Sequence, residues 1–114
     1  MEELMMLAKQ SLSIVDTSTI KDDEIEMWIR AGKEDLKRQD INSELDNPLV
    51  KSAIVMFVKS NFGNVDLKEK ELSQKTYNLL CHNLGLSSDY KVVDSNAWYS
   101  LYITIYYYWT RWNR

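Results

Sequence analysis

The 114-residue chain contains one cysteine, one histidine, one proline and three glycines. The single Cys81 excludes an internal disulfide framework, and such cysteine usage is typical of proteins made in a reducing compartment. His82 is the lone imidazole, whereas a zinc site usually needs four Cys, His or carboxylate ligands. Neither a glycine-rich phosphate loop nor a G-x-S-x-G nucleophile elbow is present in the sequence. We therefore expect no metal and no cofactor.

Long apolar runs are also missing. No run approaches the roughly 20 residues that a membrane-spanning helix requires. The chain opens with acidic Glu2 and Glu3 rather than with the basic residues that begin a signal peptide. The sequence therefore predicts cytosolic synthesis and no membrane partner.

Positive charge is scarce in the first part of the chain. The net charge is −3 overall, and residues 1–46 hold six Lys or Arg against twelve Asp or Glu. Binding along a phosphate backbone needs clustered Lys and Arg. An acidic chain of this kind is thus a poor candidate for gripping nucleic acid.

The residues with catalytic potential do not form a recognisable constellation. Cys81 and His82 are neighbours in a predicted helix, where adjacent side chains point about 100° apart and cannot form a nucleophile–base pair. The carboxylate cluster of Asp22, Asp23, Glu24 and Glu26 suits the positive end of a helix dipole better than a metal. We expect that the protein is not an enzyme.

Hydrophobic periodicity predicts an all-α fold. Asn47 can cap a helix whose first residue is Pro48, and we expect Gly63 and Gly85 to end helices. Gly32 lies on an apolar stripe and should permit the close approach of a neighbouring helix. The predicted helices span residues 2–11, 22–39, 48–62 and 66–84, and together they form a helical domain over residues 1–90.

Two of these helices carry apolar patterns that predict their place in the bundle. The helix at 48–62 has a wide apolar surface, which is typical of a central helix contacted on several sides. In the helix at 66–84 we expect four leucines to face inward. They are Leu72, Leu79, Leu80 and Leu84.

Aromatic residues are concentrated in the C-terminal arm, residues 91–114. Eight of the chain's thirteen aromatic residues fall in the last seventeen positions. Rings of this size bury large apolar areas when they can, so the arm either packs on its own bundle as a fifth helix or docks on another chain as an extended arm or strand. We favour the extended arm. The predicted partner-binding residues are Trp98, Tyr99, Tyr102, Tyr106, Tyr108, Trp109 and Trp112.

Several segments of residues 1–90 resemble one known family. They are the opening MEELMMLAKQSLSIVD, the acidic helix start KDDEIEMWIRAGKEDLKRQDI, and NPLVKSAIVMFVKSNFG, followed by a helix that ends in SSDY. In their order and spacing these segments resemble the head–tail connector (adaptor) proteins of tailed bacteriophages, often called DNA-packaging proteins. The aromatic arm matches no pattern of that family.

The resemblance implies a structural part of the virion. Members of the family are small helical bundles that assemble into a homo-oligomeric ring beneath the portal protein at the head–tail junction. The ring extends the channel, through which genomic DNA passes without sequence-specific binding, and it presents a surface to the next neck or tail-completion protein. A ring follows from heterologous contacts whose rotation closes. Such a protein would be made in the cytoplasm of a host bacterium.

A second function remains open from the sequence. A small helical domain can also be a DNA-binding regulator of the helix-turn-helix kind. Its recognition helix should carry an exposed row of Arg, Lys, Asn or Gln, and none of the predicted helices shows such a row clearly. Binding to duplex DNA with a steep salt dependence would favour this alternative.

Overall fold

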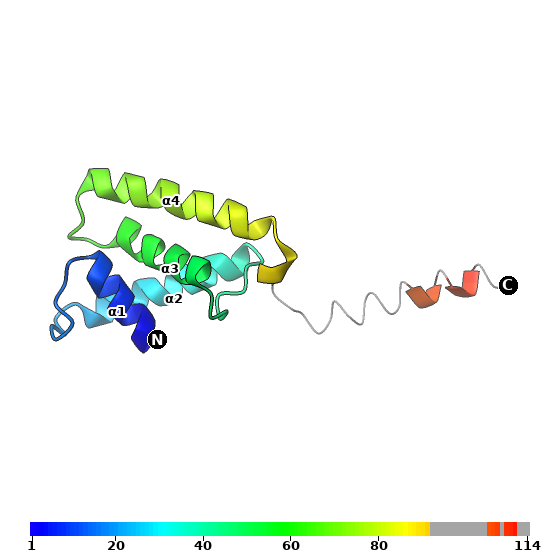
Figure 1. Ribbon diagram of the computed structural model, residues 1–114, viewed down its shortest axis with the longest axis horizontal. Coiled ribbons are helices and arrows are strands. Elements are labelled where there is room, and N and C mark those ends of the chain that lie inside the picture. The colour runs from blue at the N-terminus through cyan, green and yellow to red at the C-terminus, as the bar shows by residue number, and fades with distance from the viewer. Residues whose placement is uncertain (92–104, 108, 112–114) are drawn as a thin grey trace.

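The computed structural model describes residues 1–91, 105–107 and 109–111. Within residues 1–91 four α-helices and one short 3-10 helix follow one another, and this confirms the predicted all-α bundle (Figure 1). The observed helix boundaries lie close to those expected from the sequence. The elements are α1 (Glu2–Ser11), α2 (Asp22–Arg38), α3 (Pro48–Asn61), α4 (Leu67–Gly85) and the 3-10 helix η1 (Ser88–Tyr90).

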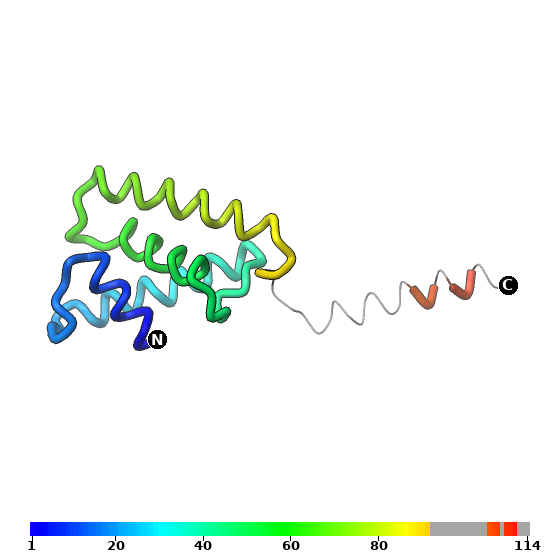
Figure 2. The backbone as a smooth tube through the Cα atoms, viewed as in Figure 1, coloured from blue at the N-terminus to red at the C-terminus, as the bar shows by residue number. Residues whose placement is uncertain are grey.

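Helix α3 is the centre of the bundle, as its wide apolar surface predicts. It packs against α1, α2 and α4, and α1 also packs against α2. Figures 1 and 2 show α4 along one side of α3, with α1 and the N-terminus on the other side. The core is built from all four helices and from the connections around them. Its residues are Leu4, Ala8, Ile25, Ile29, Leu36, Ile41, Val50, Ala53, Ile54, Val58, Phe62, Tyr77, Cys81 and Leu84.

The contact between α2 and α3 is close because α2 has a glycine at the crossing. A Cβ placed on Gly32 would lie 3.0 Å from Cδ1 of Phe57. The Phe57 ring is itself held by two neighbours, with the Tyr77 ring centroid 5.3 Å away and the Trp28 centroid 6.3 Å away. The predicted role of Gly32 in close helix approach is confirmed.

The start of α3 also follows the sequence prediction. Oδ1 of Asn47 accepts a hydrogen bond from the backbone N–H of Leu49 at 2.8 Å, and Pro48 is the first helical residue. This capping satisfies one of the amide groups that every helix start leaves without an intrahelical partner.

The two predicted glycines lie at helix ends but do not close them in a left-handed conformation. Gly85 is the last residue of α4, Gly63 follows the C-cap residue Phe62 of α3, and no glycine has a positive φ. The left-handed positions belong to Ser13 (φ 59°) after α1 and Asp40 (φ 62°) after α2. Both helices close with the pair of backbone hydrogen bonds of a Schellman motif. After α2, for example, the Ile41 N–H donates to the Leu36 carbonyl at 2.9 Å. Ile41 and Leu36 are both buried, so the turn is also fixed by an apolar contact.

A buried lysine secures the loop between α1 and α2. The Lys9 side chain is only 8% exposed, and its Nζ donates to the carbonyls of Asp16 (3.2 Å) and Ser18 (2.9 Å). The same ammonium forms an ion pair with Asp22 Oδ1 at 2.8 Å. Lys9 thereby ties the loop to the first residue of α2.

The inward face of α4 differs from the predicted one. Leu84 is buried and Leu80 is partly buried, as expected, but Leu72 and Leu79 are exposed. The buried side of α4 instead carries small and polar residues that allow close packing and one hydrogen bond to α2. These residues are Ser73, Tyr77 and Cys81, together with Leu84.

Candidate interaction surfaces

The described part of the aromatic arm is helical and solvent-facing. Residues 105–107 and 109–111 are in helical conformation, and the Thr110 hydroxyl donates to the Tyr107 carbonyl at 2.9 Å. At these residues the fifth-helix alternative describes the backbone better than the strand that we favoured. The exposed fractions of Ile105, Tyr106, Tyr107 and Trp109 are 58–67%.

The predicted partner-binding residues can thus be placed only in part. Tyr106 and Trp109 are among the described residues, and both present more than half of their surface to solvent. The others lie outside the described residues. They are Trp98, Tyr99, Tyr102, Tyr108 and Trp112.

A second exposed apolar surface lies on the bundle itself, and we call it the leucine face. It consists of Leu72, Leu79 and Leu86, which are 62–76% exposed. Because the three leucines recur every seven residues, they line one side of α4, and Leu86 continues the helical backbone just after it. Figure 1 shows α4 at the edge of the bundle. The exposure of the three leucines shows that α3 does not cover this side of α4.

The charged residues of α4 flank the leucine face without pairing to other helices. None of them takes part in an ion pair among the residues that the structure describes. They are Lys68, Glu69, Lys70, Glu71 and Lys75. The ion pairs that do occur join α1, α2, α3 and the connections, so α4 has the least neutralised surface of the bundle.

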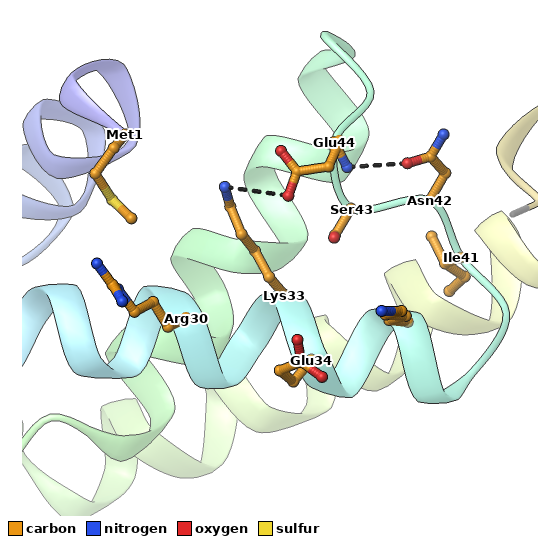
Figure 3. Close-up of a pocket in the computed structure, with 9 residues that line it drawn as sticks. Met1, Arg30, Lys33, Glu34, Ile41, Asn42, Ser43 and Glu44 are labelled. Atoms are coloured by element: carbon orange, nitrogen blue, oxygen red, sulfur yellow. Dashed lines mark hydrogen bonds and ion pairs between the residues drawn. The ribbon is translucent and has the colours of Figure 1, made fainter.

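An open pocket lies between α2 and the connection that follows it (Figure 3). It has a volume of about 430 Å³. In Figure 3 the Lys33 ammonium points toward the Glu44 carboxylate, 3.5 Å away, and Arg30 extends toward Met1. Arg30 is also paired with Glu26 at 2.7 Å. Because carboxylates neutralise two of its cations, this pocket is a mixed-charge surface and gives little support for an anion site.

A polar cluster joins α2 to α4. The Tyr77 hydroxyl donates to Oδ2 of Asp35, Gln39 Nε2 donates to the same oxygen at 3.0 Å, and Arg38 Nη2 donates to Oδ1 at 2.7 Å. Burial raises the pKa of the Asp35 carboxyl, but these hydrogen bonds outweigh burial and hold the pKa below its usual 3.8. Asp35 is therefore an ionised acceptor that locks the two helices together.

Two other titratable groups near this cluster, Tyr77 and Cys81, are held in their neutral forms. Burial, followed by the hydrogen bond to Asp35, raises the pKa of Tyr77 far above its usual 10.0. Burial also raises the pKa of the Cys81 thiol. A reactive cysteine needs a lowered pKa and some exposure, and Cys81 has neither. His82 is exposed on the other side of α4, so the structure keeps these neighbours apart, as the helical spacing predicts.

The described residues contain no cluster of His, Cys, Asp or Glu that could hold a metal ion. Within residues 1–91, 105–107 and 109–111 no helix is long and apolar enough to cross a membrane. What the described surface does offer is exposed apolar area, on the arm and on α4.

Sequence reasoning placed the arm among the candidate surfaces but missed the leucine face. A signal for it was present, since Ser73, Tyr77, Cys81 and Leu84 also recur at helical spacing. Because leucine has a larger apolar side chain than serine or cysteine, the sequence favoured the leucine side of α4 as the buried one, and that side is exposed. The hydrogen bond between Tyr77 and Asp35, which fixes the rotation of α4, joins residues far apart in the sequence and leaves no local pattern.

Comparison with known proteins finds no family model, no curated protein and no solved structure that matches the chain.

Proposed function

We propose that the chain is a structural subunit of a tailed bacteriophage neck, a head–tail connector that acts through protein–protein contacts. The observation that carries the proposal is the exposed apolar area on two separate surfaces, the aromatic arm and the leucine face. Large exposed apolar side chains that gather on one side of a protein indicate a site where other proteins bind. The order and spacing of the segments that resemble connector proteins supply the setting.

In this proposal copies of the chain form a ring beneath the portal protein and prolong the DNA channel. Tyr106 and Trp109 of the arm contact the portal or a neck component. Tyrosine and tryptophan suit such anchoring, since they combine a large rigid contact area with a polar group. The net charge of −3 lets DNA pass without being gripped, because like charge repels phosphate.

The direct test is the presence and position of the protein in the virion encoded by the same genome. Mass spectrometry of purified particles should detect the chain in many copies, and a gold label on it should lie at the head–tail junction. Absence from intact particles would refute the proposal. Tight binding to duplex DNA with a steep loss of affinity as salt rises would favour the alternative, a small DNA-binding regulator.

A further inference from the structure

The leucine face has a counterpart on the other side of the bundle. A cavity of about 300 Å³ opens beside the N-terminal half of α1, and we call it the methionine pocket. In Figure 1 the N-terminus, beside which this pocket opens, lies on the side of the bundle away from α4. The residues that line it are Met1, Glu2, Met5, Met6, Lys9, Asp16 and Asp22.

The pocket and the leucine face suit one another in size and in apolar character. A cavity of about 300 Å³ has room for one leucine side chain. Methionine is flexible and polarisable, so Met5 and Met6 can adapt to the shape of an entering side chain. Met6 is 45% exposed and Leu79 is 62% exposed, so each group has apolar surface to bury.

The charges around the two surfaces differ in balance. Lys68 and Lys75 lie four residues before Leu72 and Leu79, and Glu69 lies three residues before Leu72, so this side of α4 carries two lysines against one carboxylate. At the pocket, Glu2 and Asp16 are exposed, and neither carboxylate is in an ion pair with any residue of the described structure. Such complementarity favours an encounter of the two surfaces and fixes its register.

A contact within one copy is ruled out by position, because α3 lies between α4 and α1 (Figure 2). We propose that the leucine face of one copy docks on the methionine pocket of a second copy, with Leu79 as the side chain that enters the pocket. The two surfaces differ, so the contact is heterologous, and the bound pair still offers one free leucine face and one free methionine pocket. Repetition then gives a closed ring or an open filament. The choice of a ring rests on the proposed function, whereas the contact itself does not.

The test uses the full chain and one variant for each surface. Leu79→Glu places a carboxylate opposite Glu2 and Asp16, and Met6→Glu places one inside the pocket. Both positions are exposed, and far-UV circular dichroism checks that each variant keeps the helical fold. In sedimentation velocity the unmodified chain should associate as its concentration rises, and each variant alone should remain monomeric.

Mixing the variants separates the proposed contact from other modes of association. Leu79→Glu retains an intact pocket and Met6→Glu retains an intact leucine face, so an equimolar mixture should form a one-to-one complex and nothing larger. Leu49→Ser is the matched control. Leu49 is an exposed apolar residue that belongs to neither surface, so its replacement should leave association unchanged. If one variant proves unfolded, Lys75→Glu and Glu2→Lys are used in place of Leu79→Glu and Met6→Glu. Each of these two substitutions alone should weaken association, and the two combined in one chain should restore it.

Three results would overturn the inference. The first is an unmodified chain that stays monomeric at every concentration. The second is self-association that Leu79→Glu abolishes and Met6→Glu leaves intact. The third is a loss of association in the Leu49→Ser control as large as the loss in the two variants. The second result would indicate a symmetric contact between two α4 helices.

The inference and the proposed function can fail separately. If copies associate through these surfaces but the chain is absent from virions, the proposed function is wrong and the contact stands. If the chain enters virions and both variants still enter with it, the contact is wrong and the proposed function stands.

Discussion

Gly32→Ala tests the close contact between α2 and α3, on which the geometry of the bundle depends. The added Cβ would lie 3.0 Å from Cδ1 and 3.3 Å from Cγ of Phe57. Favourable contacts between carbon atoms need about 3.5–4.0 Å. The Phe57 ring cannot turn away freely, because Tyr77 packs against it with its centroid 5.3 Å away. Helix α3 must therefore shift to accommodate the methyl group.

The expected size of the effect follows from two opposing contributions. Replacing glycine by alanine inside a helix stabilises it by about 1 kcal/mol. Overpacking a tight contact costs about 1–3 kcal/mol. We expect Gly32→Ala to lower the free energy of unfolding by about 1 kcal/mol, because an overpacking cost of about 2 kcal/mol exceeds the helix-propensity gain of about 1 kcal/mol. Gly85→Ala is the matched control, since Gly85 is helical and its Cβ would meet nothing within 4 Å. It should raise the free energy of unfolding by about 0.5–1 kcal/mol.

Urea denaturation followed by far-UV circular dichroism measures both variants against the unmodified chain. We expect the free energy of unfolding to change with opposite sign in the two variants, while the slope of that free energy against urea concentration stays the same. If Gly32→Ala stabilises the protein as much as Gly85→Ala does, α2 and α3 do not approach as closely as described and the reasoning fails.

Three further predictions concern stability. Lys9→Met should lower the free energy of unfolding by about 2–3 kcal/mol in urea denaturation, because it leaves two carbonyls and the Asp22 carboxylate without their buried partner; an effect below about 0.5 kcal/mol would contradict that role. Ser13→Gly should raise the free energy of unfolding by about 1 kcal/mol, since glycine adopts φ 59° without strain, whereas Ser11→Gly in the last turn of α1 should lower it. If both variants lower the free energy of unfolding equally, Ser13 is not in a left-handed turn. The lowered pKa of Asp35 means that its ionised form stabilises the fold above about pH 3.8 and that this stabilisation disappears as pH falls through the folded pKa. Asp35→Asn should therefore weaken the fall of the thermal midpoint on acidification, and an unaltered acid profile would contradict the assignment.

The sequence predicts the helices well because their signals are local. Asn47 and Pro48 mark the start of α3 by capping and by a fixed φ, and the apolar stripe around Gly32 marks the buried side of α2. The closing turns are harder to foresee, because Ser13 and Asp40 take a left-handed conformation that glycine usually adopts. Aspartate tolerates this conformation better than serine does, but in both turns the flanking apolar contacts and backbone hydrogen bonds hold the residue there.

The candidate surfaces were predictable to different degrees. The aromatic arm is visible in composition alone, so Tyr106 and Trp109 could be named from the sequence. The leucine face could not, because α4 has two sides with helical spacing. Only packing against α3 and the hydrogen bond from Tyr77 to Asp35 decide which side is buried.

The central claim is that the arm acts on other protein chains rather than on its own bundle. The most direct measurement compares the full chain with a chain truncated after Asp94, using circular dichroism and capture of the portal protein encoded by the same genome. We predict that the truncated chain keeps a cooperatively folded helical bundle and loses the portal that the full chain captures. A truncated chain that unfolds, or a full chain that remains a lone monomer and captures no portal, would contradict the claim.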